Sequence, residues 1–247
     1  MRYNYLYMDP WSAPQKEINC CRKPIYVCLS GNSGAGKSTL LRKVSTALYA
    51  AEQDTIAIDE KAVHHQLLPY LFDDTSRYGY LLQLNFMIQR ALLIKSWLDK
   101  GFNLVMERSH IEDYIFINFM LHAGYINHSQ HNTYMSLWNQ LNDLLPSPDI
   151  IAFLNFDIKH SIENLQKDEF LGIRPKEFIS EELKYHWISG WHTEYQTFVE
   201  KLPVPLRERV LICNSSKDID SLSERIMYKI HEIRRAHAPK DHSLSNH

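Results

Sequence analysis

A glycine-rich octapeptide near the N-terminus constrains this chain more than any other feature. It reads Gly31-Asn32-Ser33-Gly34-Ala35-Gly36-Lys37-Ser38 and matches the phosphate-binding pattern G-x-x-x-x-G-K-[ST]. The segment before it, 25–30, is apolar like a buried strand, and the segment after Lys37 has the periodicity of a helix. A strand, this loop and a helix in that order predict a P-loop that binds the phosphates of a nucleoside triphosphate.

Each part of this loop suits phosphate binding. The glycines let backbone N–H groups point inward at phosphate oxygens, and the Lys37 ammonium provides a charge for the β- and γ-phosphates. The Ser38 hydroxyl is suited to ligate Mg²⁺, and the N-terminal end of the next helix attracts the same anion. We therefore expect ATP or GTP as phosphate donor, with Mg²⁺, bound by Gly31, Asn32, Ser33, Gly34, Ala35, Gly36, Lys37, Ser38 and Thr39.

Short apolar segments alternate with long periodic ones along the rest of the chain. Strands are predicted over 25–30, 55–58, 103–106, 150–156 and 210–213. Helices are predicted over 37–51, 77–100, 111–122, 129–144, 158–167, 178–200 and 219–235, and the charged stretch 168–176 as a loop. This alternation is typical of parallel βαβ units. We expect one α/β domain over 24–235, with a five-stranded parallel sheet flanked by helices on both faces. An irregular N-terminal arm (1–23) and a disordered tail (236–247) would flank it.

Composition excludes several classes of function. The net charge of −2 argues against a dedicated nucleic-acid binder. No apolar run approaches the roughly 18 to 20 residues of a membrane span, so neither nucleic acid nor membrane is expected as a partner. The four cysteines form no spaced framework, which favours reduced thiols and a cytoplasmic location.

The other motifs of the chain, its length and its lack of repeats narrow the class of P-loop protein. A GTPase needs a base-reading Asn-Lys-x-Asp segment, and the sequence has none. Its 247 residues and the absence of internal repeats argue against a motor or transporter ATPase. A kinase that phosphorylates a small acceptor remains.

Polar residues stand where an acceptor would bind. Glu60 follows the second predicted strand, and Glu107-Arg108 follows the third. In open α/β sheets, ligands bind beyond the carboxyl ends of the strands, so these groups should meet the P-loop in one crevice. Gln83 and Arg90 are seven residues apart and share one face of the long helix.

These blocks, in this order and spacing, resemble the deoxynucleoside kinase family, and in particular its bacterial deoxyadenosine/deoxyguanosine kinase branch. The resemblance covers about residues 24–200. It rests on the P-loop, the Arg77-Tyr78…Gln83…Arg90 helix, Glu107-Arg108-Ser109…Glu112-Asp113-Tyr114-Ile115-Phe116, Leu121-His122-Ala123-Gly124-Tyr125-Ile126, Asn132-Thr133-Tyr134 and Leu144-Leu145-Pro146-Ser147-Pro148-Asp149. It implies the P-loop kinase fold, a homodimer, and phosphorylation of a nucleoside 5′-hydroxyl, with a purine deoxynucleoside as the favoured acceptor.

The resemblance also implies catalytic roles. Glu60 would be the general base for the 5′-hydroxyl, with Asp59 as the rival candidate. Arg108 would hold the 5′-oxygen or the transferring phosphoryl group together with Lys37. Glu107 would hold Mg²⁺ with Ser38.

Substrate-binding roles follow in the same way. Gln83 would read the base, helped by a pair between Arg90 and Asp113, since an amide offers both a donor and an acceptor. Phe86 is equally explained by stacking on the base and by core packing.

Two departures from the family pattern leave alternatives open. Phe72 replaces a tyrosine that contacts the sugar 3′-hydroxyl in the family. The lid stretch is about three residues short and keeps only Lys167 and Arg174 as cations for the triphosphate, with Glu169 as the candidate sugar-binding carboxylate. A kinase of nucleoside monophosphates or of another small hydroxyl compound is therefore a second hypothesis. A non-catalytic nucleotide-binding regulator on a kinase scaffold is a third.

Overall fold

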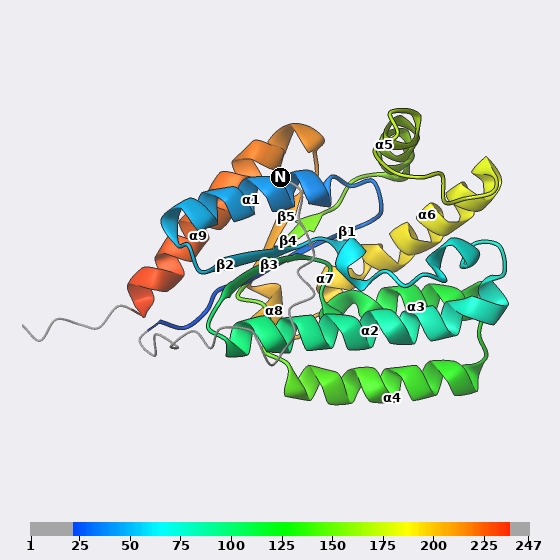
Figure 1. Ribbon diagram of the computed structural model, residues 1–247, viewed down its shortest axis with the longest axis horizontal. Coiled ribbons are helices and arrows are strands. Elements are labelled where there is room, and N and C mark those ends of the chain that lie inside the picture. The colour runs from blue at the N-terminus through cyan, green and yellow to red at the C-terminus, as the bar shows by residue number, and fades with distance from the viewer. Residues whose placement is uncertain (1–21, 238–247) are drawn as a thin grey trace, which may run out of the picture.

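Five parallel strands form the central sheet of the protein, for which a computed structural model describes residues 22–237. They lie in the order β2-β3-β1-β4-β5 (Figure 1). Their bounds are Tyr26–Gly31 (β1), Thr55–Ile58 (β2), Asn103–Glu107 (β3), Ile150–Leu154 (β4) and Val210–Cys213 (β5). The predicted five-stranded parallel sheet is confirmed. The central strands β1, β3 and β4 are buried along their whole length, which explains why they read as continuous apolar runs.

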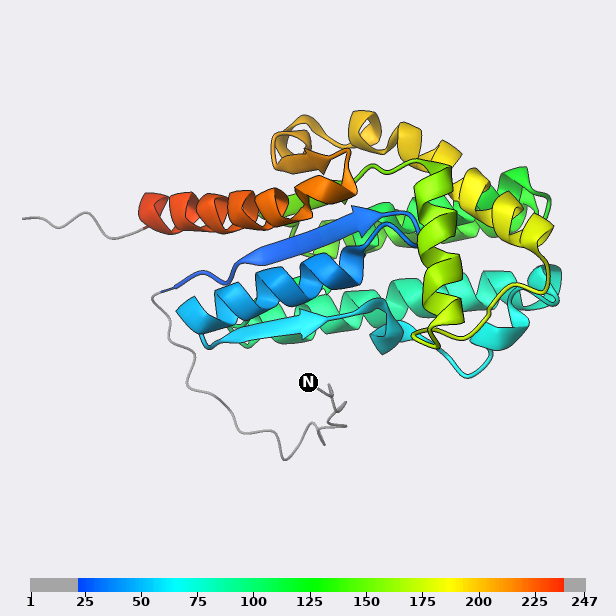
Figure 2. The same cartoon turned by 90° about the horizontal axis from the view of Figure 1, so that it is seen from above.

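Helices cover both faces of this sheet, as predicted (Figures 1 and 2). Helices α1 (Lys37–Ala51) and α9 (Ile219–Ala236) lie together on one face. On the other face lie α2 (Thr75–Asp99), α3 (Asp113–His122) and α6 (Glu181–Gln196), with α4 (His128–Leu144) packed outside α2 and α3. Helix α5 (Ile158–Phe170) stands beside the P-loop end of the sheet. Short α7 (Phe198–Lys201) and α8 (Val204–Arg207) lead into β5.

Short 3₁₀ turns fill the remaining connections. They are η1 (Glu60–Val63), η2 (Leu68–Tyr70), η3 (His110–Glu112) and η4 (Ser216–Asp218). The first follows β2 and the third follows β3, so both begin at the carboxyl edge of the sheet. This edge is where the P-loop also lies.

The predicted loop over 168–176 is partly wrong, because α5 continues to Phe170. Nothing in Asp168 to Phe170 breaks a helix. The chain turns only at Gly172, whose φ is 67°. The N–H of Ile173 donates to the carbonyl of Asp168 (2.9 Å), and the N–H of Gly172 donates to that of Glu169 (3.1 Å). This is the glycine-ended Schellman arrangement that closes many helices.

Other predicted bounds shift by a few residues. The helix expected over 178–200 begins only at Glu181, because the Ser180 hydroxyl accepts from the N–H of Leu183 and caps it there. The same helix ends at Gln196, and α7 follows it as a separate turn.

The flanking predictions lie largely outside the described residues. Of the predicted arm, residues 1–21 lie outside, and of the predicted tail, residues 238–247 do. Across residues 22–237, no helix is long and apolar enough to cross a membrane.

The amino edge of the sheet, far from the P-loop, is fastened by Arg234 of α9. Its guanidinium makes two 2.9 Å contacts to the Glu52 carboxylate and donates to Asn103 Oδ1 at 2.8 Å. These contacts join the last helix to the end of α1 and the start of β3.

This clamp predicts a stability effect without a catalytic one. Replacing Arg234 by Ala leaves the half-buried Glu52 without its main partner. The free energy of unfolding in urea should therefore fall by about 1–3 kcal/mol. Arg235→Ala, at an exposed position on the same helix, is the matched control and should change stability by less than about 0.5 kcal/mol. Equal losses in the two variants would contradict this account of Arg234.

Candidate active site

The phosphate loop is built between β1 and α1 and is seated on α5. Gly36 caps α1 with a φ of 88°, and Gly34 has a φ of 76°. A Cβ at Gly34 would lie 2.2 Å from the carbonyl oxygen of Ser161 in α5, so no larger residue fits there. Asn164 of α5 also donates from Nδ2 to the carbonyl oxygen of Gly34 at 2.7 Å. These two contacts hold the Gly34 part of the loop against α5.

Lys37 lies within the curve of this loop. Its Nζ donates to the carbonyl oxygens of Gly31 (3.0 Å) and Asn32 (2.8 Å), and the residue is 5% exposed. Burial, together with the positive charge of Arg108, lowers the pKa of Lys37 to about 8. Its ammonium is thus held where triphosphate oxygens would provide a stronger partner than two carbonyls.

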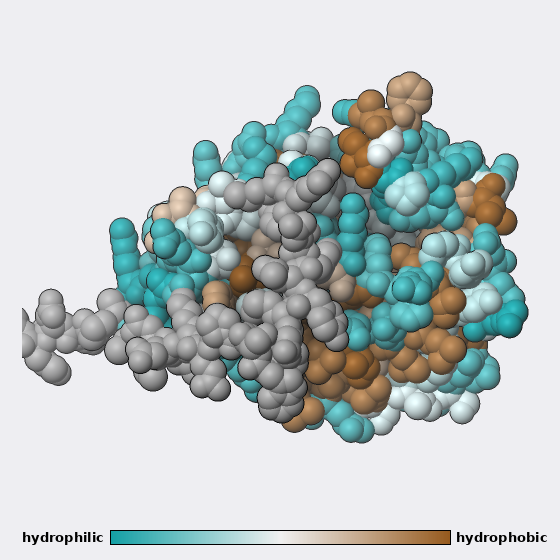
Figure 3. Space-filling view, in the orientation of Figure 1, coloured by the Kyte–Doolittle hydropathy of each residue, from teal (hydrophilic) through white to brown (hydrophobic). Residues whose placement is uncertain are grey.

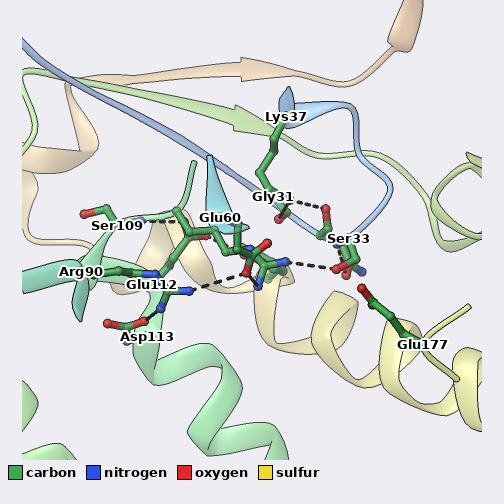
Figure 4. A network of polar contacts seen from close by, with 12 residues as sticks. Gly31, Ser33, Lys37, Glu60, Arg90, Ser109, Glu112, Asp113 and Glu177 are labelled. Atoms are coloured by element: carbon green, nitrogen blue, oxygen red, sulfur yellow. Dashed lines mark hydrogen bonds and ion pairs between the residues drawn. The ribbon is translucent and has the colours of Figure 1, made fainter. Parts of the chain in front are cut away.

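Glu60 lies at the centre of a charged network that faces the P-loop (Figure 4). Its Oε1 is 3.1 Å from Arg108 Nη1 and 3.6 Å from Arg90 Nη2. Burial raises the pKa of Glu60, but Arg108, Lys37 and Arg90 outweigh burial and lower it to about 2. The carboxylate is therefore charged throughout the physiological range.

Arg108 links this network to the P-loop. Its Nη2 donates to Ser33 Oγ at 3.2 Å, while Nη1 contacts Glu60. The guanidinium lies 4.4 Å from the ring centroid of Phe116 and 5.7 Å from that of Trp191. Arg108 is also the one non-glycine residue within 22–237 with a positive φ, at 57°. Such a conformation is costly and persists only where its surroundings enforce it.

A second pocket wall comes from α2 and α3. Arg90 pairs with Asp113, and both side chains are buried. The carboxylates of Asp113 and Glu60 hold the pKa of Arg90 above its usual value although burial opposes this. Gln83, 3% exposed on the same face of α2, has a buried Oε1 without a hydrogen-bond partner. An unpartnered buried amide oxygen indicates a place for a ligand donor. Phe86, on the same helix, lies under the Arg90 guanidinium at 5.6 Å.

Glu107 and Ser38 fit the predicted magnesium site. Glu107 Oε1 is buried without a hydrogen-bond partner, as a carboxylate awaiting a cation would be. Burial raises the pKa of Glu107, whereas Lys37 and the Ser38 hydroxyl lower it. Carboxylate and hydroxyl oxygens are the donors that Mg²⁺ prefers.

The lid, residues 167–178, carries the three residues expected to bind ligands, Lys167, Glu169 and Arg174. Glu169, the expected sugar ligand, accepts from the buried Lys184 Nζ at 2.8 Å. Arg174 is tied to Glu177 by two 2.9 Å contacts. Lys167 is exposed. The tip of α5 and the turn after it are apolar and exposed at Phe170, Leu171 and Ile173, as the upper part of Figure 3 shows.

Phe72 is enclosed by other aromatic rings. It lies 4.2 Å from Phe178 and 5.0 Å from Trp187, measured between ring centroids, and is 7% exposed. The residue thus packs the end of the lid against α6.

Three side chains near the site have no local sequence signal. The Glu177 carboxylate points toward Ser33 of the P-loop (Figure 4). This orientation depends on the path of the lid. Trp191 of α6 lies beside the Arg108 guanidinium, and Tyr195 of α6 donates to Glu112, although helical spacing alone suggests ordinary packing for both. Their contacts join residues about 80 positions apart in the chain.

Fold and contacts together define a P-loop phosphotransferase whose phosphate loop faces a carboxylate held by two arginines. The chain belongs to the deoxynucleoside kinase family, whose sequence profile matches residues 27–234. It is therefore a kinase with a nucleoside hydroxyl as acceptor, as the sequence predicted.

Individual relatives are distant but nearly full-length. Deoxyadenosine/deoxycytidine kinase of Bacillus subtilis is 24% identical over 218 residues, covering 85% of this chain and 94% of the relative. Deoxyguanosine kinase of Lactobacillus johnsonii is 25% identical over 218 residues, covering 84% and 93%. The structure of deoxyadenosine kinase from M. mycoides with bound dATP matches with a TM-score of 0.67 at 21% identity, covering 83% of this chain and 98% of that one. It confirms the P-loop kinase fold.

The lowered pKa of Lys37 gives a pH-dependent prediction. Without ligand, the ammonium loses its proton as pH rises through about 8. Bound phosphate oxygens favour the charged form and raise this pKa. ATP binding near pH 8 should therefore take up protons, and affinity should fall as pH rises from about 7 to about 9.

Calorimetric titration with ATP in two buffers of different ionisation enthalpy measures this uptake. Lys43→Gln, at a half-exposed position on the same helix, is the control and should keep it. Proton uptake near zero in the unaltered protein would contradict the account of Lys37.

Proposed function

We propose that this protein transfers the γ-phosphoryl group of ATP or GTP to the 5′-hydroxyl of a purine deoxynucleoside. The observation that carries the proposal is the bridge made by Arg108, which contacts Glu60 on one side and Ser33 of the P-loop on the other. An acceptor oxygen at Glu60 would thereby lie next to the donor phosphates. The named activities of the relatives, on deoxyadenosine, deoxycytidine and deoxyguanosine, support a deoxynucleoside acceptor.

In this proposal Glu60 is the general base and Arg108 the phosphoryl-binding cation. A carboxylate with a pKa of about 2 is a weak base, yet phosphoryl transfer has a loose transition state that requires little early proton removal. Glu60 would accept a hydrogen bond from the 5′-hydroxyl, orient it, and take its proton late. Arg108 and Lys37 would neutralise the charge on the transferring group.

Magnesium would bind at Ser38 and Glu107. Ser38 and Glu107 would hold the ion, which would supply positive charge to offset that of the donor phosphates. The unpartnered Glu107 Oε1 supports this placement.

The base would lie against α2. The unpartnered Oε1 of Gln83 can accept from a base amino or imino group, and its amide nitrogen can donate. Arg90, fixed by Asp113, would hold the far side of the base pocket, and Phe86 would lie beside the ring. The purine preference rests on the deoxyadenosine and deoxyguanosine in the names of two relatives, the first of which also names the pyrimidine deoxycytidine.

For the sugar, we propose Glu177 in place of Glu169. Glu169 accepts from the buried Lys184, whereas Glu177 pairs with the half-buried Arg174 and its carboxylate points toward the P-loop side of the site. Phe72 offers no hydroxyl, and in this proposal the Glu177 carboxylate accepts from the sugar 3′-hydroxyl, with Tyr70 and Tyr78 as the alternatives. Arg174, released from Glu177, would then bind the donor phosphates. Lys167 would be the second lid cation.

A homodimer in the cytoplasm completes the proposal. Helix α2 exposes Leu81, Ile88 and Leu92, which are spaced by seven and four residues and so share one face. Figure 3 shows apolar surface where α2 and α4 lie. This face suits pairing with a second copy of the chain.

Glu60→Gln tests the catalytic assignment. With ATP, Mg²⁺ and each common deoxynucleoside, the unaltered protein should form the 5′-monophosphate. The variant should keep its KM values and lose at least about 100-fold in kcat, the usual contribution of general-base catalysis. Asp59→Asn, the neighbouring carboxylate and rival base, is the matched control and should lose little.

Each outcome decides a separate point. Absence of turnover with every nucleoside, while ATP still binds, would overturn the proposed reaction in favour of another acceptor or a regulatory role. Unchanged turnover in Glu60→Gln would move the base elsewhere.

A second pair of variants tests the lid. Glu177→Gln removes a charged hydrogen-bond acceptor for the sugar and should raise the nucleoside KM about tenfold. Glu169→Gln should leave that KM unchanged and lower the melting temperature, because it weakens the partner of buried Lys184. The opposite pattern would return the sugar-binding role to Glu169.

A further inference from the structure

Helix α6 contacts three separate parts of the site through one stripe of residues. Lys184, Ile188, Trp191 and Tyr195 follow each other at spacings of four, three and four, so they lie on one helix face. The Lys184 ammonium pairs with Glu169 at the end of α5, and the Ile188 carbonyl accepts from Asn32 Nδ2 of the P-loop at 2.9 Å. Trp191 lies beside the Arg108 guanidinium, and Tyr195 contacts Glu112, four residues further along the chain.

Tyr195 is joined through Glu112 to the part of the chain that follows Arg108. Its hydroxyl donates to Glu112 Oε2 at 2.6 Å, and Glu112 Oε1 accepts from the backbone N–H of Ser109 at 3.2 Å. Glu112 is fully buried and Tyr195 is 2% exposed. The Glu112 carboxylate therefore links Tyr195 of α6 to the peptide group that directly follows Arg108.

The Tyr195–Glu112 contact supports the backbone next to Arg108. The left-handed backbone of Arg108 must be enforced by its surroundings, and the next residue, Ser109, is held on both its N–H and its hydroxyl. The hydroxyl accepts from Tyr26 at 2.9 Å and from the N–H of Ile111 at 3.4 Å. Trp191 adds its ring beside the guanidinium and packs edge-to-face on Phe116 at 5.3 Å.

We propose that Tyr195, acting through Glu112, is a positioning residue for Arg108, and that Trp191 supports the same side chain directly. The contact sets where the guanidinium stands between Glu60 and the P-loop. Neither residue touches the reacting atoms. This inference rests on the proposed function, in which Arg108 binds the transferring phosphoryl group.

Tyr195→Phe is the direct test, with ATP and whichever nucleoside the unaltered protein phosphorylates fastest. The ring packing against Phe153 and Phe198 is kept, and only the hydroxyl is lost. A misplaced Arg108 weakens the transition state more than substrate binding. The kcat should therefore fall about tenfold, while both KM values stay within about twofold. Tyr185→Phe, at an exposed position on the same helix, is the control and should match the unaltered protein.

Glu112→Gln and the double variant show whether Tyr195 acts through Glu112. If it does, the double variant is no slower than the slower single variant, since both remove one connection. Losses that multiply would overturn the inference, as would an unchanged kcat in Tyr195→Phe.

Measuring kcat well below the melting temperature of each variant separates a loss of positioning from a loss of stability. A kcat loss that vanishes under those conditions would contradict the inference. Trp191→Phe provides a second variant if Tyr195→Phe does not fold, and it should also lower kcat at unchanged KM. Failure of the unaltered protein to phosphorylate any nucleoside would instead count against the proposed function.

Discussion

The ion pair between Arg108 and Glu60 joins the proposed acceptor position to the phosphate loop. Glu60 comes from the turn after β2 and Arg108 from the end of β3, while Ser33, the other partner of Arg108, belongs to the loop after β1. Three neighbouring parallel strands thus deliver three groups to one place. Because Arg108 is buried, removing the Glu60 carboxylate would leave an uncompensated charge.

This arrangement explains why so many contacts converge on a short segment. Arg108 has a backbone conformation that only its surroundings enforce, and its side chain is enclosed by two aromatic rings. Tight placement suits phosphoryl transfer, in which catalysis consists mainly of positioning and charge neutralisation. The buried Gln83 Oε1 and Glu107 Oε1 have no hydrogen-bond partner in the protein, and the proposed base and magnesium sites would use them.

Much of this architecture is encoded locally. The P-loop pattern, the alternation of strands and helices, and the polar residues after β2 and β3 predicted the sheet and the meeting of Glu60, Arg108 and Lys37. Parallel strands bring their carboxyl ends to one edge, so a strand assignment is enough to place these residues together.

The lid and α6 could not be predicted in the same way. Glu169 and Glu177 are eight residues apart in one charged stretch, and only the Schellman turn at Gly172 determines that one meets Lys184 while the other turns toward the P-loop. Likewise, the Tyr195–Glu112 contact joins residues 83 positions apart and leaves no periodic trace in the sequence.

A crystal structure with a purine deoxynucleoside and a non-hydrolysable ATP analogue tests the central claim most directly. The account predicts the 5′-hydroxyl within hydrogen-bond reach of Glu60, the base edge at Gln83, and Lys37 moved from the Gly31 and Asn32 carbonyls to the donor phosphates. A nucleoside bound elsewhere, or one whose 5′-hydroxyl lies away from Glu60 and Arg108, would contradict it.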